Sequence, residues 1–227
     1  YPWLNRVLSP RDVSFHGYSF ELLFKEDSRP FVWRTACRRD FLAKHAIQFD
    51  ESISYGEDQV FEMAIYGRSR KTTLISNKLY DYRVARKGSL MDTMRYDDEM
   101  RLLEHVKIYS AVLADWHRDD LDAQHADDLA YFLCDLVLYD AIRLLGTGCG
   151  KVFDAVSTVL AGSAVGSEAA LTQCAPSVAA IVRAALANKA PSARACRRLM
   201  FEYDVLRSGF LRACKRMAAN ILGKRDV

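Results

Sequence analysis

The sequence Ser54-Tyr55-Gly56-Glu57-Asp58 leads from a polar loop into a helix that the apolar pattern predicts from residue 57 onward. Apolar residues at positions 60, 61, 64 and 65 recur with helical spacing, so we expect one face of this helix to pack on a sheet. Glu57 and Asp58 then fall in its first turn, where free backbone N–H groups and the helix dipole favour negative charge. A carboxylate that stays ionised there suits a general base. An ordinary acidic helix start explains the same two residues without catalysis.

Short motifs on both sides of this stretch follow one another in a characteristic order. They are Pro30-Phe31-Val32-Trp33, Cys37-Arg38-Arg39-Asp40-Phe41-Leu42, Ile47-Gln48-Phe49-Asp50-Glu51, and Tyr80-Asp81-Tyr82-Arg83 with Gly88-Ser89-Leu90. Together with Tyr55-Gly56-Glu57-Asp58 they resemble the second half of a bacterial family 2 glycosyltransferase, over roughly residues 18–92. The resemblance implies a GT-A fold and a nucleotide-sugar donor.

The resemblance also implies roles for the residues around the acidic pair. Asp58 is the implied catalytic base, which deprotonates the acceptor hydroxyl, and Glu57 is its neighbour in the acceptor pocket. Trp33 and Tyr55 flank the pair, and aromatic rings commonly stack on the apolar face of a sugar. Packing in the core explains these two aromatic residues as well. Gly56 would allow a close approach of the backbone or a positive φ.

A basic segment follows the Tyr-x-Tyr motif. The resemblance implies Arg83 as the first candidate, and Arg86 as the second, for binding the leaving diphosphate. A guanidinium matches phosphate oxygens in a fork and keeps its charge. Such charge would stabilise the transition state. A solvated basic loop is the alternative for Arg86 and Lys87. Arg34-Thr35-Ala36-Cys37 departs from the family pattern, which places an Asn or Arg and then Lys-Leu-Tyr after the Trp.

The nucleotide-binding part of a GT-A enzyme has no counterpart before Trp33, where βαβ units and a Gly-rich turn would be expected. The only Asp-x-Asp, Asp120-Leu121-Asp122, lies between two helical patterns and is interpreted as helix-cap material. We therefore expect a fragment that is inactive alone. The absent half would bind the nucleotide sugar and most ligands of a Mg²⁺ or Mn²⁺ ion.

Composition indicates an ordinary globular protein. The 227 residues are half hydrophobic, and a net charge of +3 gives no reason to expect nucleic acid as a partner. We see no signal peptide and no apolar run long enough to span a bilayer. The five histidines and six cysteines lack metal-ligand spacing, so we expect no metal site and no cofactor in this chain. We interpret the cysteines as reduced thiols in a cytoplasmic protein.

The predicted fold class is α+β and mostly α. Residues 1–95 are expected to form the acceptor-side α/β part of a GT-A domain, and residues 96–227 a helical bundle. Within the first part, residues 1–17 are expected to be irregular, and residues 31–37 to be a strand or an extended entry. Strands are predicted over residues 72–76 and 79–84, and Gly67 is expected to end the helix that begins at Glu57.

The C-terminal segment from Lys189 to Val227 is basic and amphipathic. Such a segment can lie on an anionic membrane surface, at the inner face of the cell membrane, which would suit an enzyme with a lipid-linked or cell-envelope glycan acceptor. The favoured interpretation is instead that the apolar side packs on its own domain and the basic side is solvated; homodimer formation is also open. A rival function therefore exists, namely a helical interaction module for dimerisation or membrane docking without catalysis.

Overall fold

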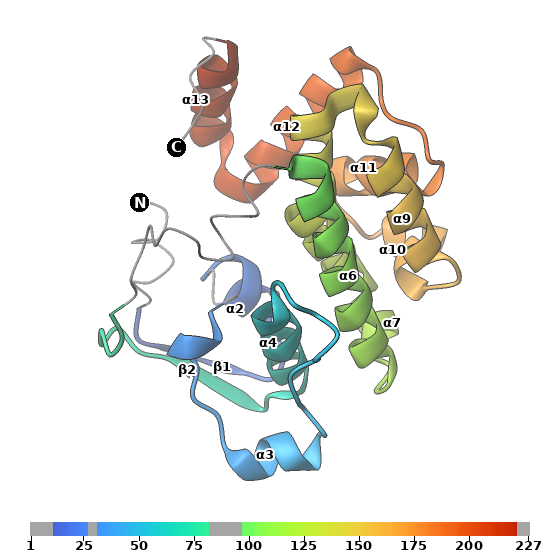
Figure 1. Ribbon diagram of the computed structural model, residues 1–227. Helices are drawn as coiled ribbons and strands as arrows, with labels where there is room; N and C mark the ends of the chain where they lie inside the picture. The colour runs from blue at the N-terminus through green and yellow to red at the C-terminus, as the bar shows by residue number, and fades with distance from the viewer. Residues whose placement is uncertain (1–10, 27–30, 82–96, 222–227) are drawn as a thin grey trace. The chain divides into compact units, whose positions relative to one another are not determined.

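The computed structural model describes residues 11–26, 31–81 and 97–221, with side chains described up to residue 218 (Figure 1). Its contacts divide the chain into two compact units. The first takes its described residues from Tyr1–Tyr96 and Lys107–Leu121, and the second comprises Asp97–Val106 and the described part of Asp122–Val227. The predicted fold class, α+β and mostly α, is confirmed. The domain boundary after residue 95 stays a prediction.

The sheet of the first unit contains a strand that the sequence did not reveal. β1 (Val13–His16) pairs antiparallel with β2 (Lys71–Leu74), and the hydroxyl groups of Ser14 and Thr73 lie 2.8 Å apart across the pair. Residues 13–16 were expected to be irregular, because four residues carry too little periodicity to predict a strand without knowledge of the partner. The strand expected over 79–84 is wrong for residues 79–81, which have no regular structure, and residues 82–84 lie outside the described residues.

Three short helical segments precede the acidic pair. They are α2 (Phe20–Phe24), η1 (Val32–Arg34) and α3 (Arg39–Lys44). Residues 31–37 were expected to be a strand or an extended entry; both are wrong for Val32–Arg34, which form the 3₁₀ turn η1, whereas Thr35 after it is extended. Phe31 has a φ of +104°, which turns the chain where an extended segment would have continued. This turn brings Arg34 and Thr35 toward the next long helix.

That helix, α4 (Glu57–Arg68), is buried on all sides from Val60 to Tyr66, although one apolar face was predicted. The expected end at Gly67 is also wrong. A Cβ at Gly67 would lie 3.1 Å from the indole of Trp116, so the glycine allows close packing rather than ending the helix. The indole Nε1 of Trp116 donates a 3.1 Å hydrogen bond to the carbonyl of Met63.

The C-terminal half of α6 (Asp98–His117) belongs to the same unit and is tied to α4 by Arg68. The guanidinium of Arg68 is 2.6 Å from a carboxylate oxygen of Asp115 and 2.6 Å from one of Asp119. It also donates to the backbone carbonyls of Ala64 and Asp115. Because the Arg68 side chain is only 3% exposed, these partners compensate for the burial of its charge.

The second unit is entirely helical over its described residues, as predicted. Helix α11 lies against α8, α9 and α12, and α12 in turn carries α13 (Figure 1). Gly209, with a φ of +84°, separates α12 from α13, so the last helix begins at Phe210. The elements are α7 (Leu121–Gln124), α8 (Ala126–Leu133), η2 (Cys134–Leu138), η3 (Ala141–Leu145), η4 (Gly146–Gly148), α9 (Gly150–Leu160), η5 (Ala164–Gly166), α10 (Glu168–Leu171), α11 (Pro176–Leu186), α12 (Ala193–Ser208) and α13 (Phe210–Ile221).

All six cysteines are free thiols. None of the helices in the described part of the chain is both long and apolar enough to cross a membrane.

Candidate functional site

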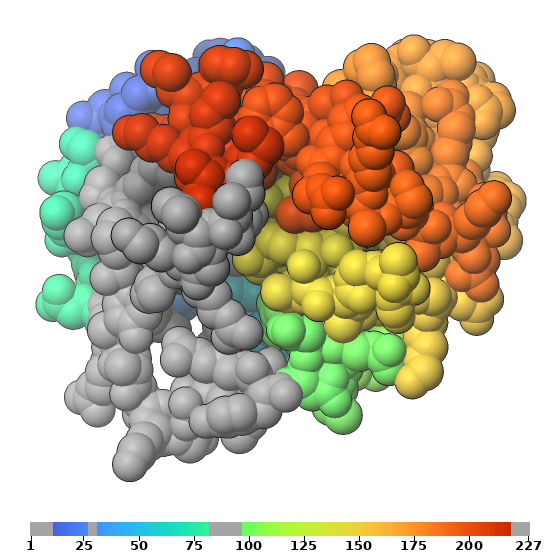
Figure 2. All heavy atoms as spheres, turned by 90° about the horizontal axis from the view of Figure 1, so that it is seen from above, coloured from blue at the N-terminus to red at the C-terminus, as the bar shows by residue number. Residues whose placement is uncertain are grey.

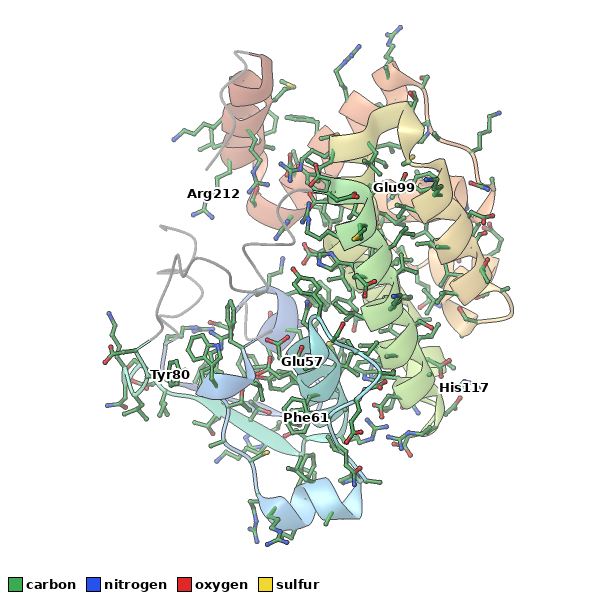
Figure 3. The ribbon with its side chains drawn as sticks, viewed as in Figure 1. Glu57, Phe61, Tyr80, Glu99, His117 and Arg212 are labelled. Carbon is green, nitrogen blue, oxygen red and sulfur yellow. The ribbon has the colours of Figure 1, made fainter. Side chains whose placement is uncertain are left out.

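The start of α4 is held in place by Gly56. This residue has a φ of +75°, and a Cβ on it would clash with Cδ1 of Ile108 in α6. The structure confirms the predicted positive φ and adds the reason for a close approach, which is the packing of the loop on Ile108. The constrained backbone leads directly into Glu57 and Asp58, which lie in the first turn of α4. Glu57 is labelled at this end of α4 in Figure 3.

Asp58 is half-buried, and its Oδ1 accepts a 2.9 Å hydrogen bond from the backbone N–H of Gln59. Burial raises the pKa of Asp58, and the negative charge of Glu57 raises it further, against the effect of that hydrogen bond. The helix start was expected to keep this carboxylate ionised; burial and the charge of Glu57 act against that effect, and the ionised state stays a prediction. A carboxylate whose pKa is raised toward the working pH accepts a proton more readily, which is what a general base requires.

A second carboxyl group, Glu62, lies one helical turn after Asp58 and has no solvent exposure. The hydroxyl of Thr35 donates a 2.6 Å hydrogen bond to Oε1 of Glu62, whereas Oε2 has no hydrogen-bond partner among the described residues. Burial raises the pKa of Glu62 to about 7; the Thr35 hydrogen bond and the charge of Arg34 oppose this rise, and the charge of Asp58 adds to it. The two carboxyl groups are therefore electrostatically coupled.

Tyr66 continues the same helix face one turn further on, since residues 58, 62 and 66 are spaced by four. Its side chain is buried, and burial together with the charge of Glu62 raises the pKa of its phenol. Sequence reasoning missed Glu62 and Tyr66 because both stand in an apolar run. One feature of the sequence could have identified Glu62 as a candidate site residue. It is a glutamate four residues after Asp58, among apolar residues that pack in the core.

The structure places Trp33 in an aromatic cluster. Its ring stacks on Tyr80 with centroids 4.5 Å apart and an interplanar angle of 25°, and it also contacts Phe31 at 5.3 Å. Trp33 and Phe31 are half-buried, while Tyr80 is exposed and extends from the segment after β2 (Figure 3). Partly exposed rings of this kind can stack on a sugar. Tyr55, half-buried, lies in the loop directly before Gly56.

The remaining predicted residues are not brought to this site by the described structure. Arg83 and Arg86, the candidates for binding the diphosphate, lie outside the described residues. Asp120 precedes α7 and Asp122 lies in its first turn, which agrees with a helix-start role. In the described ranges, no three His, Cys, Asp or Glu side chains gather in a way that could hold a metal ion.

Two bacterial glycosyltransferases are similar to parts of the chain. The poly(ribitol-phosphate) beta-N-acetylglucosaminyltransferase TarS of Staphylococcus aureus (strain Mu50) is 32% identical over 98 residues, or 41% of this chain. The uncharacterized glycosyltransferase EpsJ of Bacillus subtilis (strain 168) is 27% identical over 134 residues, or 57% of this chain. The chain covers 16% of the length of the first relative and 36% of the second.

No protein-family model matches the chain, and no solved structure matches it significantly. Both of the similar proteins are nevertheless named as glycosyltransferases. Over part of its length, the chain is therefore related to bacterial glycosyltransferases.

Proposed function

We propose that this chain supplies the acceptor side of a glycosyltransferase of the family 2, GT-A type, with Asp58 as the general base. The observation that carries the proposal is the position of Asp58, half-buried at a constrained helix start beside Glu57, in a chain with glycosyltransferase relatives. Trp33, Tyr55 and Gly56 would line the acceptor site. The nucleotide-sugar donor would bind mainly to a part of a longer protein outside these 227 residues, and this chain alone would be inactive.

In the proposed reaction the acceptor hydroxyl gives its proton to the carboxylate of Asp58. The oxygen of the acceptor hydroxyl then forms a bond to the anomeric carbon of the donor sugar. At the same time the bond from that carbon to the diphosphate oxygen breaks, and the nucleotide diphosphate leaves. Arg83, with Arg86, would stabilise the negative charge of the leaving group. The described residues offer no ligand set for a divalent cation, so Mg²⁺ or Mn²⁺ would be held by other residues.

One relative suggests a class of acceptor, since the name of the staphylococcal enzyme contains poly(ribitol-phosphate). By extension, we propose a cell-envelope or exopolysaccharide glycan, free or lipid-linked, as the acceptor of this protein at the cytoplasmic face of the membrane.

The test uses the longest natural protein that contains this chain and a panel of nucleotide sugars with Mg²⁺ or Mn²⁺. Asp58→Asn is expected to lower kcat by about 100-fold or more, because it removes the proton acceptor, and to leave donor binding unchanged. Asp40→Asn, which changes an exposed carboxylate in α3, is the control. Equal turnover of wild type and Asp58→Asn would remove Asp58 as the base.

The rival function, a helical interaction module without catalysis, makes a different prediction. It requires that no donor of the panel is bound or turned over by the longer protein. In that case Glu57 and Asp58 would be only an acidic helix start, and the functional surface would lie on the helices of the second unit.

A further inference from the structure

The last helix of the described chain exposes a row of apolar side chains. Phe210 is 62% exposed, Leu211 is 77% exposed and Met217 is 46% exposed. Together with Cys214 they occupy one side of α13 at helical spacing, and we call this set the apolar face of α13. Figure 2 shows α13 and α12, in red and orange, at the surface of their unit.

The orientation of α13 is set by contacts on its other side. Ala213 is fully buried, and Arg216 forms an ion pair with the buried carboxylate of Asp204 in α12. The phenol of Tyr139 also donates to both oxygens of Asp204, at 3.0 and 3.1 Å. The ring of Phe210, at the edge of the apolar face, also meets Phe201 of α12 edge-on, with centroids 6.1 Å apart. Because these contacts hold one side of α13 against α12, Leu211 and Met217 are turned outward and Phe210 stays largely exposed. The favoured expectation that the apolar side packs on its own domain is therefore wrong for α13.

The charges next to the apolar face have one sign. Helix α13 contains Arg212, Lys215 and Arg216 and no acidic residue. Arg212 and Lys215 are exposed, and Figure 3 shows the Arg212 side chain pointing away from α13. Long basic side chains beside exposed apolar residues are typical of helices that lie at the surface of a membrane. The basic side chains reach the anionic headgroups, while the apolar side chains insert at the boundary between the headgroups and the acyl chains.

A second copy of this chain is a poorer partner for the same face. A symmetric pair would bring the basic side chains of two α13 helices together without acidic partners from that helix. The face also consists of four side chains, whereas a stable dimer buries about 800 Å² on each partner. An anionic lipid surface has neither disadvantage.

We infer that α13 docks this protein on anionic membrane surfaces, with its apolar face inserted and Arg212 and Lys215 contacting the headgroups. Because α13 has basic residues beside its apolar face, the contact is at the membrane surface. The inference does not depend on the proposed catalytic role of Asp58. It would hold the protein beside a lipid-linked or surface-bound acceptor.

The test is co-sedimentation of the 227-residue chain with vesicles of phosphatidylcholine, with and without phosphatidylglycerol. Binding is expected with phosphatidylglycerol and should weaken as salt is added. Leu211→Gln is expected to reduce binding about tenfold or more, since a leucine no longer inserts. Lys215→Gln is expected to reduce it about fivefold. Leu79→Gln is the matched control, because Leu79 is 79% exposed but lies in the first unit.

Three kinds of result would overturn the inference. The first is vesicle binding that is absent with anionic lipid, or that Leu79→Gln reduces as much as Leu211→Gln does. The second is a concentration-dependent dimer of the wild-type chain, detected by light scattering, that is absent in Leu211→Gln. The third is binding by the 227-residue chain but not by the longer protein, which would show that another segment covers the apolar face. Circular dichroism of each variant checks that the fold is kept.

Discussion

The hydroxyl of Thr35 donates a 2.6 Å hydrogen bond to Oε1 of Glu62, a carboxyl group with no solvent exposure. This bond connects the 3₁₀ turn η1 to the centre of α4, one helical turn after the proposed base Asp58. A buried carboxyl group with one satisfied oxygen is costly in its ionised form. The stability of the first unit should therefore depend on pH through Glu62. The charge near Asp58 should also depend on whether Glu62 is protonated.

Glu62→Gln is expected to change the pH dependence of stability. The folded-state pKa of Glu62, about 7, lies above its ordinary value of 4.5, so between these pH values the folded protein holds a proton that the unfolded chain has lost. The contribution of Glu62 to the free energy of unfolding is therefore greatest below pH 4.5. It falls as the pH rises toward 7, by about 3 kcal/mol in total.

Urea unfolding of wild type and Glu62→Gln over this pH range measures the effect, because the glutamine cannot titrate. The difference between the two free energies of unfolding should shift by about 3 kcal/mol in favour of the variant as the pH rises. Parallel curves for Glu62→Gln and wild type would show that Glu62 does not titrate in this way.

Gly56→Ala is expected to destabilise the first unit more than Gly17→Ala. The two glycines have nearly the same φ, +75° and +74°, but a Cβ at Gly56 clashes with Ile108, while nothing lies within 4 Å of a Cβ at Gly17. Gly17→Ala should cost about 1–2 kcal/mol from backbone strain alone. Gly56→Ala should cost about 1–3 kcal/mol more because of overpacking.

The free energies of unfolding of these two variants and of Gly56→Ala combined with Ile108→Ala separate the contributions. The double variant should recover the part of the loss that comes from the clash. Equal losses in Gly17→Ala and Gly56→Ala would mean that Ile108 moves away without cost and does not hold the start of α4.

Arg68→Ala is expected to lower the free energy of unfolding by about 1.5–3 kcal/mol, because Asp115 and Asp119 lose a cationic hydrogen-bond donor, although Asp115 keeps Arg118 as a partner. Arg39→Ala, which removes an exposed arginine from α3, should change it by less than about 0.5 kcal/mol. Denaturant unfolding of both variants makes the comparison. A loss for Arg68→Ala no greater than that for Arg39→Ala would contradict a structural role for these ion pairs.

Arg216→Gln is expected to loosen α13, since the buried carboxylate of Asp204 would keep Tyr139 but lose its cationic partner. Loss of a hydrogen bond to a charged group costs about 1.5–3 kcal/mol. Amide hydrogen exchange over residues 210–218 should speed up in this variant and not in Arg212→Gln, where the exposed arginine of the same helix is changed. Unchanged exchange in Arg216→Gln would show that α13 is held by other contacts.

Local sequence patterns carried much of the fold. The helix from Glu57 and the helical second half were predictable, because apolar residues recur every three to four positions. This repeat can be recognised within one segment, without knowledge of the segments that pack against it. Elements whose structure depends on residues distant in the sequence were not predictable. β1 is a strand only because residues 71–74 pair with it, and Gly67 stays inside a helix only because Trp116 occupies the space beside it.

By itself, the sequence determined an α+β, mostly helical chain with an acidic pair at a helix start and a basic, amphipathic end. These features depend on composition and on neighbours within a few turns. Only the tertiary structure decided the protonation behaviour of Asp58 and Glu62, the stacking of Trp33 on Tyr80, and the outward direction of the apolar face of α13. Burial and long-range contacts set these properties, because the environment of a side chain is created by residues far away in the sequence.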